Sequence, residues 1–191
     1  ASVAPYSVTV NWGDGSQNTT FFLNSAGSLG SRSHTYSEEG NFNASVTVTD
    51  FVSGTQTTTF LVNAADADLT TGVSAPQSGN TGVAFIGIGV GSFTDANPGA
   101  PIGDFSAVID WGDGSSTSHA TFSNTGPGAF NVTGNHTYAK PGVYTVITNV
   151  FDDGGETTRL TSTCTITGRP VTGSTKNRTT VEGQGTGLFV L

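Results

Sequence analysis

Residues 10–16 read Val-Asn-Trp-Gly-Asp-Gly-Ser, and residues 109–115 repeat them closely as Ile-Asp-Trp-Gly-Asp-Gly-Ser. In the residues that lead into each motif, apolar and polar side chains alternate, which indicates a β-strand with one buried face. Gly-Asp-Gly is a turn signal, because glycine accepts the positive φ angles of tight turns. Each motif therefore predicts a strand that ends at a tryptophan and reverses into a hairpin.

A second motif follows each copy in the same order. Residues 34–36 and residues 136–138 both read His-Thr-Tyr, and a glycine and an aromatic residue come after each triplet. An alternating strand then ends at Asp50 in the first copy and at Asp152 in the second. Because matches this long in the same order signal an internal repeat, the chain is predicted to contain two similar units in tandem.

Trp-Gly-Asp-Gly followed by His-Thr-Tyr, a glycine, an aromatic residue and a strand ending in Asp resembles the PKD domain over nearly the whole chain. The resemblance implies a β-sandwich found in cell-surface, S-layer and secreted proteins and beside catalytic domains of secreted hydrolases. The expected fold class is all-β, with two tandem immunoglobulin-like (PKD-like) antiparallel β-sandwiches. A tyrosine before a strand also resembles the tyrosine corner of such folds. The residues expected in the structural core are Trp12, Trp111, Tyr36 and Tyr138.

The two units are expected to be unequal. Residues 67–168 contain a complete unit with two strands ahead of its tryptophan strand, within residues 69–93, whereas residues 1–66 lack these opening strands. The triplet Ser-Gly-Asn at residues 78–80 is expected to be the turn between them. Residues 169–191 are expected to be a linker and a strand that starts the next repeat, because residues 186–191 match residues 81–86.

The chain ends on four apolar residues, which we expect to be buried by a neighbouring copy, between strands of its incomplete first unit. These interface residues are Leu188, Phe189, Val190 and Leu191. The copies are either successive units of one long polypeptide, which the smooth join from Leu191 to Ala1 favours, or separate subunits that exchange a strand. Further copies of the chain are therefore its expected partners.

Composition limits the location and the other partners. The chain has 6 Lys and Arg against 14 Asp and Glu, a net charge of -8, which opposes binding to nucleic acid or anionic membrane surfaces. Its surface is expected to be carried by Thr, Ser, Asn and Gly, as in secreted and cell-wall proteins, so we expect an extracellular or cell-surface location. The single cysteine, Cys164, lies in an alternating strand and is expected to be a small buried apolar residue.

We expect no catalytic residues, no cofactor and no metal site. The histidines His34, His119 and His136 share no metal-ligand spacing, and the glycine run at residues 87–91 precedes no helix that would bind a dinucleotide. Calcium bound by loop residues is the alternative to a solvated loop. The residues concerned are Asp95, Asn97 and Asp104, or Asp152 and Asp153.

The expected function is that of a non-enzymatic structural repeat unit of an extracellular filament, stalk or surface-layer-like fibre, assembled head to tail through shared or donated β-strands. The alternative is an adhesin or a carbohydrate-associated spacer module of a secreted protein, in which exposed aromatic residues stack on sugars. Glycans are also candidate modifications, because five asparagines lie in Asn-x-Ser/Thr sequons. These are Asn18, Asn43, Asn131, Asn135 and Asn177.

Overall fold

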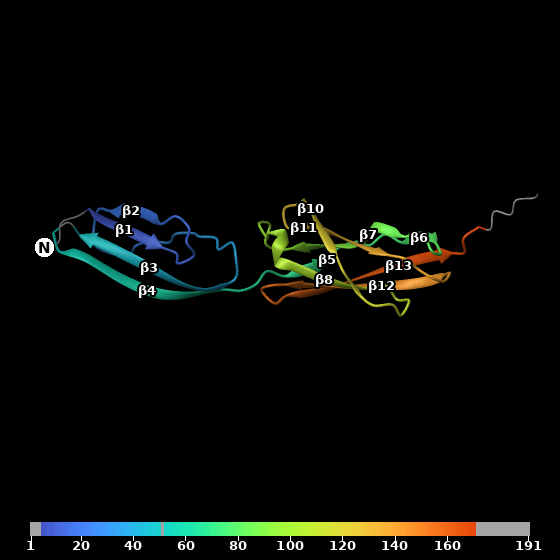
Figure 1. Ribbon diagram of the computed structural model, residues 1–191. Coiled ribbons are helices and arrows are strands. Elements are labelled where there is room, and N and C mark those ends of the chain that lie inside the picture. The colour runs from blue at the N-terminus through green and yellow to red at the C-terminus, as the bar shows by residue number, and fades with distance from the viewer. Residues whose placement is uncertain (1–4, 51, 171–191) are drawn as a thin grey trace, which may run out of the picture.

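The structure, a computed structural model, describes residues 5–50 and 52–170 of the 191-residue chain. The described residues form strands and one 3-10 turn, η1 (Ile102–Asp104), and contain no α-helix. The strands belong to three sheets. Figure 1 shows that the sheet of the first repeat and the two sheets of the second repeat follow one another along an elongated molecule.

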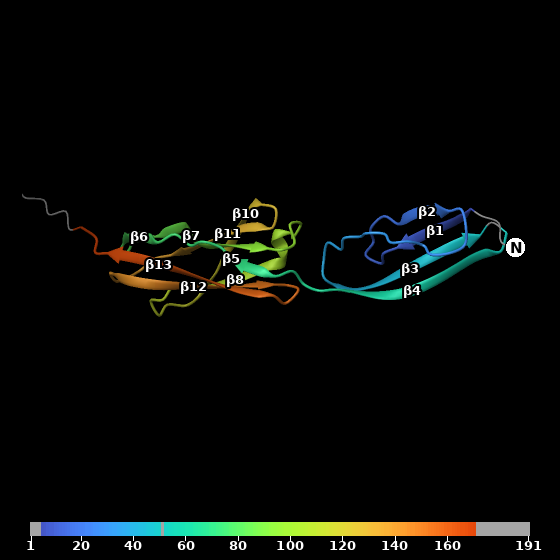
Figure 2. The ribbon, with the colours of Figure 1, turned by 180° about the vertical axis from the view of Figure 1, so that it is seen from behind.

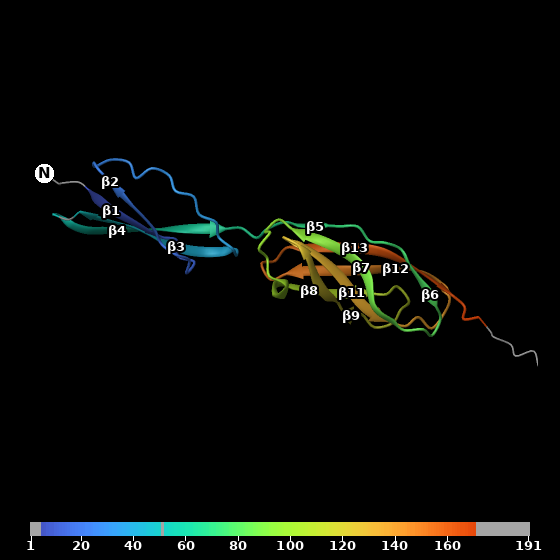
Figure 3. The same cartoon turned by 90° about the horizontal axis from the view of Figure 1, so that it is seen from above.

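The first repeat, expected to be a sandwich, forms a single antiparallel sheet in its described residues, with the strand order β2-β1-β3-β4. Its strands are β1 (Tyr6–Asn11), β2 (Thr19–Leu23), β3 (Gly40–Asp50) and β4 (Gly54–Ala64). Alternation places Val8, Val10 and Ala44 on one face, where all three are buried. Segment 24–36 runs from β2 to β3 without forming a strand, as Figure 3 shows from above.

The second repeat has two sheets, ordered β10-β11-β7-β5 and β6-β13-β12-β8-β9. All pairs are antiparallel except β6 with β13. If β5, β7, β8, β10, β11, β12 and β13 are taken as strands A, B, C, D, E, F and G, ABED faces CFG, as in immunoglobulin-type sandwiches. The strands, which Figure 2 shows from behind, are β5 (Leu69–Thr71), β6 (Gln77–Asn80), β7 (Phe85–Asp95), β8 (Phe105–Asp110), β9 (Ser118–His119), β10 (Thr121–Gly126), β11 (Ala129–His136), β12 (Gly142–Asp152) and β13 (Thr157–Thr167).

The core of the second repeat lies between its two sheets. Phe93 and Phe130 come from one sheet, and their ring centroids lie 5.0 and 4.7 Å from that of Phe105 in the other. Alternate residues of β13 face this core, among them Leu160 and Cys164. Cys164 is a free thiol that is 1% exposed, so the strand alternation places it as a small buried apolar residue.

The opening of the second repeat differs from the sequence-based expectation. The first strand, β5, covers only Leu69–Thr71. Residues 78–80, expected to form a turn, belong to strand β6, and β6 pairs in parallel with β13. Gly79 allows this pairing, because a Cβ at this position would collide with the ring of Phe85. Residues 78–80 therefore have the composition of a turn but form a strand, in which the glycine permits close packing.

Candidate functional site

The motif residues of the first repeat meet at one corner beyond the end of β1. Nε2 of His34 lies 2.6 Å from Oδ2 of Asp14, and its imidazole ring stacks on Trp12 with the ring centroids 4.5 Å apart. The hydroxyl of Tyr36 donates a hydrogen bond to the carbonyl oxygen of Trp12 at 3.0 Å. The indole N–H of Trp12 donates to Oγ1 of Thr19, also at 3.0 Å. The corner thus ties β2 and the chain before β3 to the end of β1.

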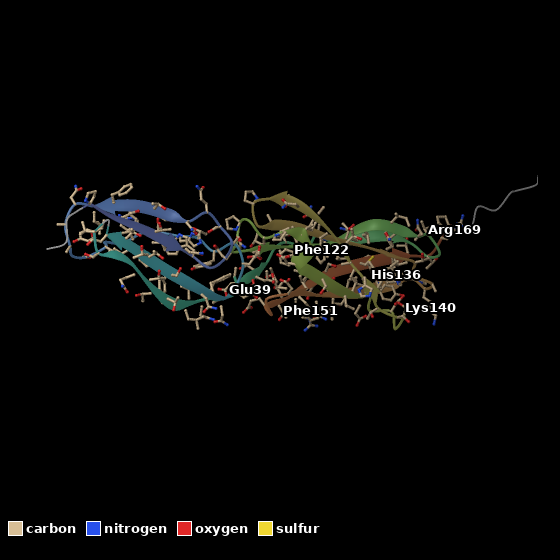
Figure 4. All side chains as sticks on the ribbon, turned by 60° about the vertical axis from the view of Figure 1, so that its left-hand side comes forward. Glu39, Phe122, His136, Lys140, Phe151 and Arg169 are labelled. Carbon is tan, nitrogen blue, oxygen red and sulfur yellow. The ribbon has the colours of Figure 1, made fainter. Side chains whose placement is uncertain are left out.

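The second repeat builds the same corner, where Figure 4 labels His136. Nε2 of His136 lies 2.8 Å from Oδ2 of Asp113, and its ring stacks on Trp111 at a centroid distance of 4.8 Å. The hydroxyl of Tyr138 donates to the Trp111 carbonyl oxygen at 3.1 Å, and the Trp111 indole N–H donates to Oγ of Ser118 at 2.9 Å. Equivalent atoms of the two repeats therefore make equivalent contacts.

The glycine after each tryptophan is required by the backbone it touches. Gly13 and Gly112 have φ angles of 84° and 75°, in the left-handed region. A Cβ at either position would collide with a carbonyl oxygen of the neighbouring strand, that of Asn43 in β3 or Thr145 in β12. The turn can therefore press against the adjacent strand only where the side chain is absent.

Hydrogen bonds keep both corner carboxylates ionised. A hydrogen bond from the side chain of Ser16 is the main cause that lowers the pKa of Asp14 to about 2, and His34 contributes in the same direction. Burial alone would raise the pKa of Asp113, but hydrogen bonds from Ser115 and His136 outweigh it and hold that pKa at about 2. Each carboxylate therefore orients its histidine over the whole range of ordinary pH.

The expected core aromatic residues differ in burial between the repeats. Trp111 is 1% exposed and Tyr138 is fully buried, whereas Trp12 and Tyr36 are half-buried. The contacts at the corner are the same in both repeats, so the difference comes from what covers each sheet. Strands β5 and β7 cover the second repeat, and the described part of the first repeat has no strand equivalent to them.

Strand β4 shows the uncovered surface most clearly. Phe60 of β4 pairs with Ala44, and Ser162 of β13 pairs with Val146 at the corresponding place in the second repeat. The side chain of Phe60 is 43% exposed, whereas that of Ser162, at the equivalent position, is only 6% exposed. We call the face of β4 that carries Phe60 and Val62 the open face.

An apolar pocket lies at the other end of the first repeat, beside β1 and β3. It has a volume of about 230 Å³, and its apolar lining includes Tyr6, Leu23, Leu29 and Val48. At the place of Tyr6, opposite the last aspartate of the neighbouring strand, the second repeat has Phe105. Leu23 and Phe122 each lie four residues beyond the hydroxyl residue bonded to the tryptophan, but Leu23 pairs with Tyr6 in β2 whereas Phe122 lies in β10 of the opposite sheet.

Acidic side chains gather where the two repeats meet, and Figure 4 labels Glu39 there. A small cavity of about 90 Å³ is lined by Glu38, Glu39, Asp66, Asp95, Asp104 and Asp152 among others. Burial raises the pKa of Asp152 to about 6, and nearby carboxylates add to the shift. Across residues 5–50 and 52–170, no group of three or more His, Cys, Asp or Glu side chains is placed to hold a metal ion.

The sequon asparagines and the predicted interface are placed as follows. Asn18, Asn43 and Asn131 are exposed. Asn135 is also exposed, and its Oδ1 accepts a hydrogen bond from the backbone N–H of Gly87 at 2.7 Å. Asn177 and the predicted interface residues, Leu188, Phe189, Val190 and Leu191, lie outside the described residues. The remaining histidine, His119, is exposed on β9 and follows Ser118, which accepts the indole hydrogen bond of Trp111.

No protein-family model and no curated protein matches the chain. Among solved structures, it is similar to the fibronectin(III)-like modules of Clostridium thermocellum CbhA, with 13% identity over 85% of this chain and 78% of that chain and a TM-score of 0.33. It is also similar to Bacteroides ovatus SGBP-B in complex with a mixed-linkage heptasaccharide, with 14% identity over 84% of this chain and 38% of that one and a TM-score of 0.27. A third neighbour, PcdhgB3 EC1-4, has 11% identity over 87% and 40% of the two chains and a TM-score of 0.30.

No helix in the described part of the chain is long and apolar enough to cross a membrane.

Proposed function

We propose that the chain is a non-enzymatic structural module of tandem PKD-type immunoglobulin-like sandwiches, a repeat unit of an extracellular filament, stalk or surface-layer-like fibre. The repeated corner carries this proposal. Its histidine, aspartate, tryptophan and tyrosine side chains bind one another and the backbone, so they are occupied in fixing strand ends. Residues 1–66 and 67–168 are the two modules, and residues 169–191 lead to the next copy.

The surface of the first repeat suits such a role. Threonine hydroxyls on neighbouring strands are joined by hydrogen bonds, with 2.9 Å between those of Thr47 and Thr57 and 3.1 Å between those of Thr49 and Thr55. Cross-strand pairs of this kind stabilise a sheet without charged residues. Only 10% of the residues of the chain are charged, so a hydroxyl-rich surface keeps it soluble.

The alternative, an adhesin or a carbohydrate-associated spacer, would need an aromatic side chain free to stack on a sugar ring. Trp111 is buried, and the rings of both Trp12 and Trp111 already stack on a histidine of the corner. These contacts favour the structural role over a binding platform at the tryptophans.

Sedimentation velocity and negative-stain electron microscopy of the purified full chain test the proposal. We expect polymers whose mean length rises with protein concentration and whose axial repeat equals the length of one chain. A chain that stays monomeric at every concentration and binds oligosaccharides on a glycan array would overturn it in favour of the alternative.

A further inference from the structure

Strand β7 completes the core of the second repeat, and its sequence reflects how it does so. The ring of Phe93 packs against those of Phe105 and Phe122, at centroid distances of 5.0 and 6.0 Å. Gly91 passes so close to β13 that a Cβ would lie 3.0 Å from Cδ1 of Leu160. Gly91 and Phe93 of the pattern Gly-x-Gly-x-Gly-x-Phe at residues 87–93 therefore combine a close approach to the opposite sheet with an aromatic side chain that fills the core.

The first repeat has an empty place for that aromatic side chain. Its apolar pocket is lined by Tyr6, the counterpart of Phe105 against which Phe93 packs, and by Leu23, which pairs with Tyr6. The strand on which a second Phe93 would stand is also missing from the described part of the first repeat. Segment 24–36, which lies where the second repeat has the β10–β11 hairpin, forms no strand. The pocket, the open face and this segment all belong to the repeat whose described residues contain no counterpart of β7.

A sequence similar to that of β7 recurs later in the chain. Residues 183–191 read Gly-Gln-Gly-Thr-Gly-Leu-Phe-Val-Leu, and residues 87–95 read Gly-Ile-Gly-Val-Gly-Ser-Phe-Thr-Asp. This alignment matches all three glycines and the phenylalanine, and it includes Gly91 and Phe93, whose roles in packing the structure explains. It replaces the alignment of residues 186–191 with residues 81–86, which matches only a threonine and a glycine at the β6–β7 turn.

We propose that residues 183–191 of one copy bind as a β-strand to the first repeat of a second copy, with Phe189 in the pocket formed by Tyr6, Leu23, Leu29 and Val48. The proposal deepens the proposed function and rests on it. A second copy is favoured because β13 ends, and Arg169 lies, at the end of the second repeat that faces away from the first (Figures 1 and 4). The donated strand would pair with segment 24–36 as β7 pairs with β11.

Site-specific disulfide cross-linking of full-length chains tests the pairing. One protein carries Leu29→Cys and an isotopically distinct one carries Phe189→Cys, both in a Cys164→Ala background, so that any mixed disulfide must join two molecules. We expect the mixed disulfide to dominate under mild oxidation. Phe22→Cys is the matched control for the acceptor, because Phe22 is exposed beside Leu23 and points to the opposite face of β2. It should give only background cross-linking.

Three results separate the possible failures. No mixed disulfide, although fibres are seen by electron microscopy, would overturn strand donation and leave the structural role intact. A disulfide that forms only within a chain carrying both substitutions, at a rate independent of concentration, would show that the strand folds back on its own chain and would also overturn the proposal. A mixed disulfide without fibres would support donation and contradict the filament.

Loss of the phenylalanine provides a second measurement that leaves both repeats intact. Phe189→Ser should raise the concentration at which half of the chains are associated on the order of 100-fold, as expected for a buried aromatic side chain. Val190→Ser is the matched control, since its counterpart Thr94 is exposed, and it should shift that concentration only severalfold at most. Equal effects of the two substitutions would contradict the placement of Phe189 in the pocket.

Discussion

Replacing Trp111 with alanine should destabilise the second repeat far more than replacing Trp12 destabilises the first. Trp111 is 1% exposed, and its ring touches the space above Gly134, where a Cβ would lie 3.0 Å from the indole. Trp111→Ala therefore removes a large aromatic side chain from a closed core, for which a loss of about 3 to 5 kcal/mol is expected. It also leaves the hydroxyl of Ser118 without its indole partner.

Trp12→Ala is the matched variant, because the half-buried Trp12 makes the same hydrogen bond and the same histidine stack. Its ring loses less apolar contact, so we expect a loss of about 1 to 2 kcal/mol. Urea denaturation followed by circular dichroism gives the stability of each variant. Hydrogen exchange of β8 and β12 amides, or of β1 and β3 amides, assigns the loss to one repeat.

A free-energy loss below about 1 kcal/mol for Trp111→Ala would refute the argument, since it would show that the indole contributes little to a closed core. Equal losses for the two variants would refute the claim that the first repeat is uncovered. For a domain of about 100 residues, the expected loss corresponds to a fall in Tm of roughly 12 °C or more, well within calorimetric resolution.

Three further predictions concern the corner and the acidic cavity. Asp14 and Asp113 have a pKa lowered to about 2, so the stability they provide is complete above about pH 4 and is lost as the pH falls toward 2; acid titration of the unfolding midpoint measures this loss. Asp152 has a pKa raised to about 6, so it destabilises the fold above that pH, and Asp152→Asn should raise stability at pH 7 by about 1 to 2 kcal/mol but have no such effect at pH 4. An unchanged midpoint at pH 7 would contradict the raised pKa. Gly112→Ala should cost roughly 3 kcal/mol in denaturant melts because its Cβ meets a carbonyl of β12, whereas Gly114→Ala, with a φ of 79° and open space around it, should cost only about 1 kcal/mol.

The strands before the two tryptophans and much of the corner could be predicted from the sequence because they rest on local signals. The alternation before Trp12 and Trp111 and the turn glycines after them each depend on a few neighbouring residues. In the structure, these signals correspond to strands β1 and β8, which both end at the corner. The pairing of each histidine with the aspartate of its Gly-Asp-Gly turn joins residues 20 or 23 positions apart, and no local pattern indicates it.

The opening strands were harder to predict, because their residues are ambiguous. Residues 78–80 have the composition of a turn, yet Gly79 is placed in β6 by its contact with Phe85, which is a tertiary effect. The hairpin of β10 and β11 escaped prediction for a related reason. Its strand β11 pairs with β7, which comes from a distant part of the chain, and the corresponding segment 24–36 of the first repeat stays without a strand although its motifs are the same.

The edge of β4 gives a separate reason to expect that another strand covers the first repeat. Natural sheets protect exposed edge strands by keeping them short or by placing Lys, Pro or a bulge in them. β4 reads Gly-Thr-Gln-Thr-Thr-Thr-Phe-Leu-Val-Asn-Ala over 11 residues, with no charge and no proline, and it pairs with β3 in continuous register. In the second repeat, the equivalent edge of β13 is paired with β6. An edge so long and uncharged would promote uncontrolled association if it were left open, so its sequence is better suited to a strand that is covered in the assembled protein.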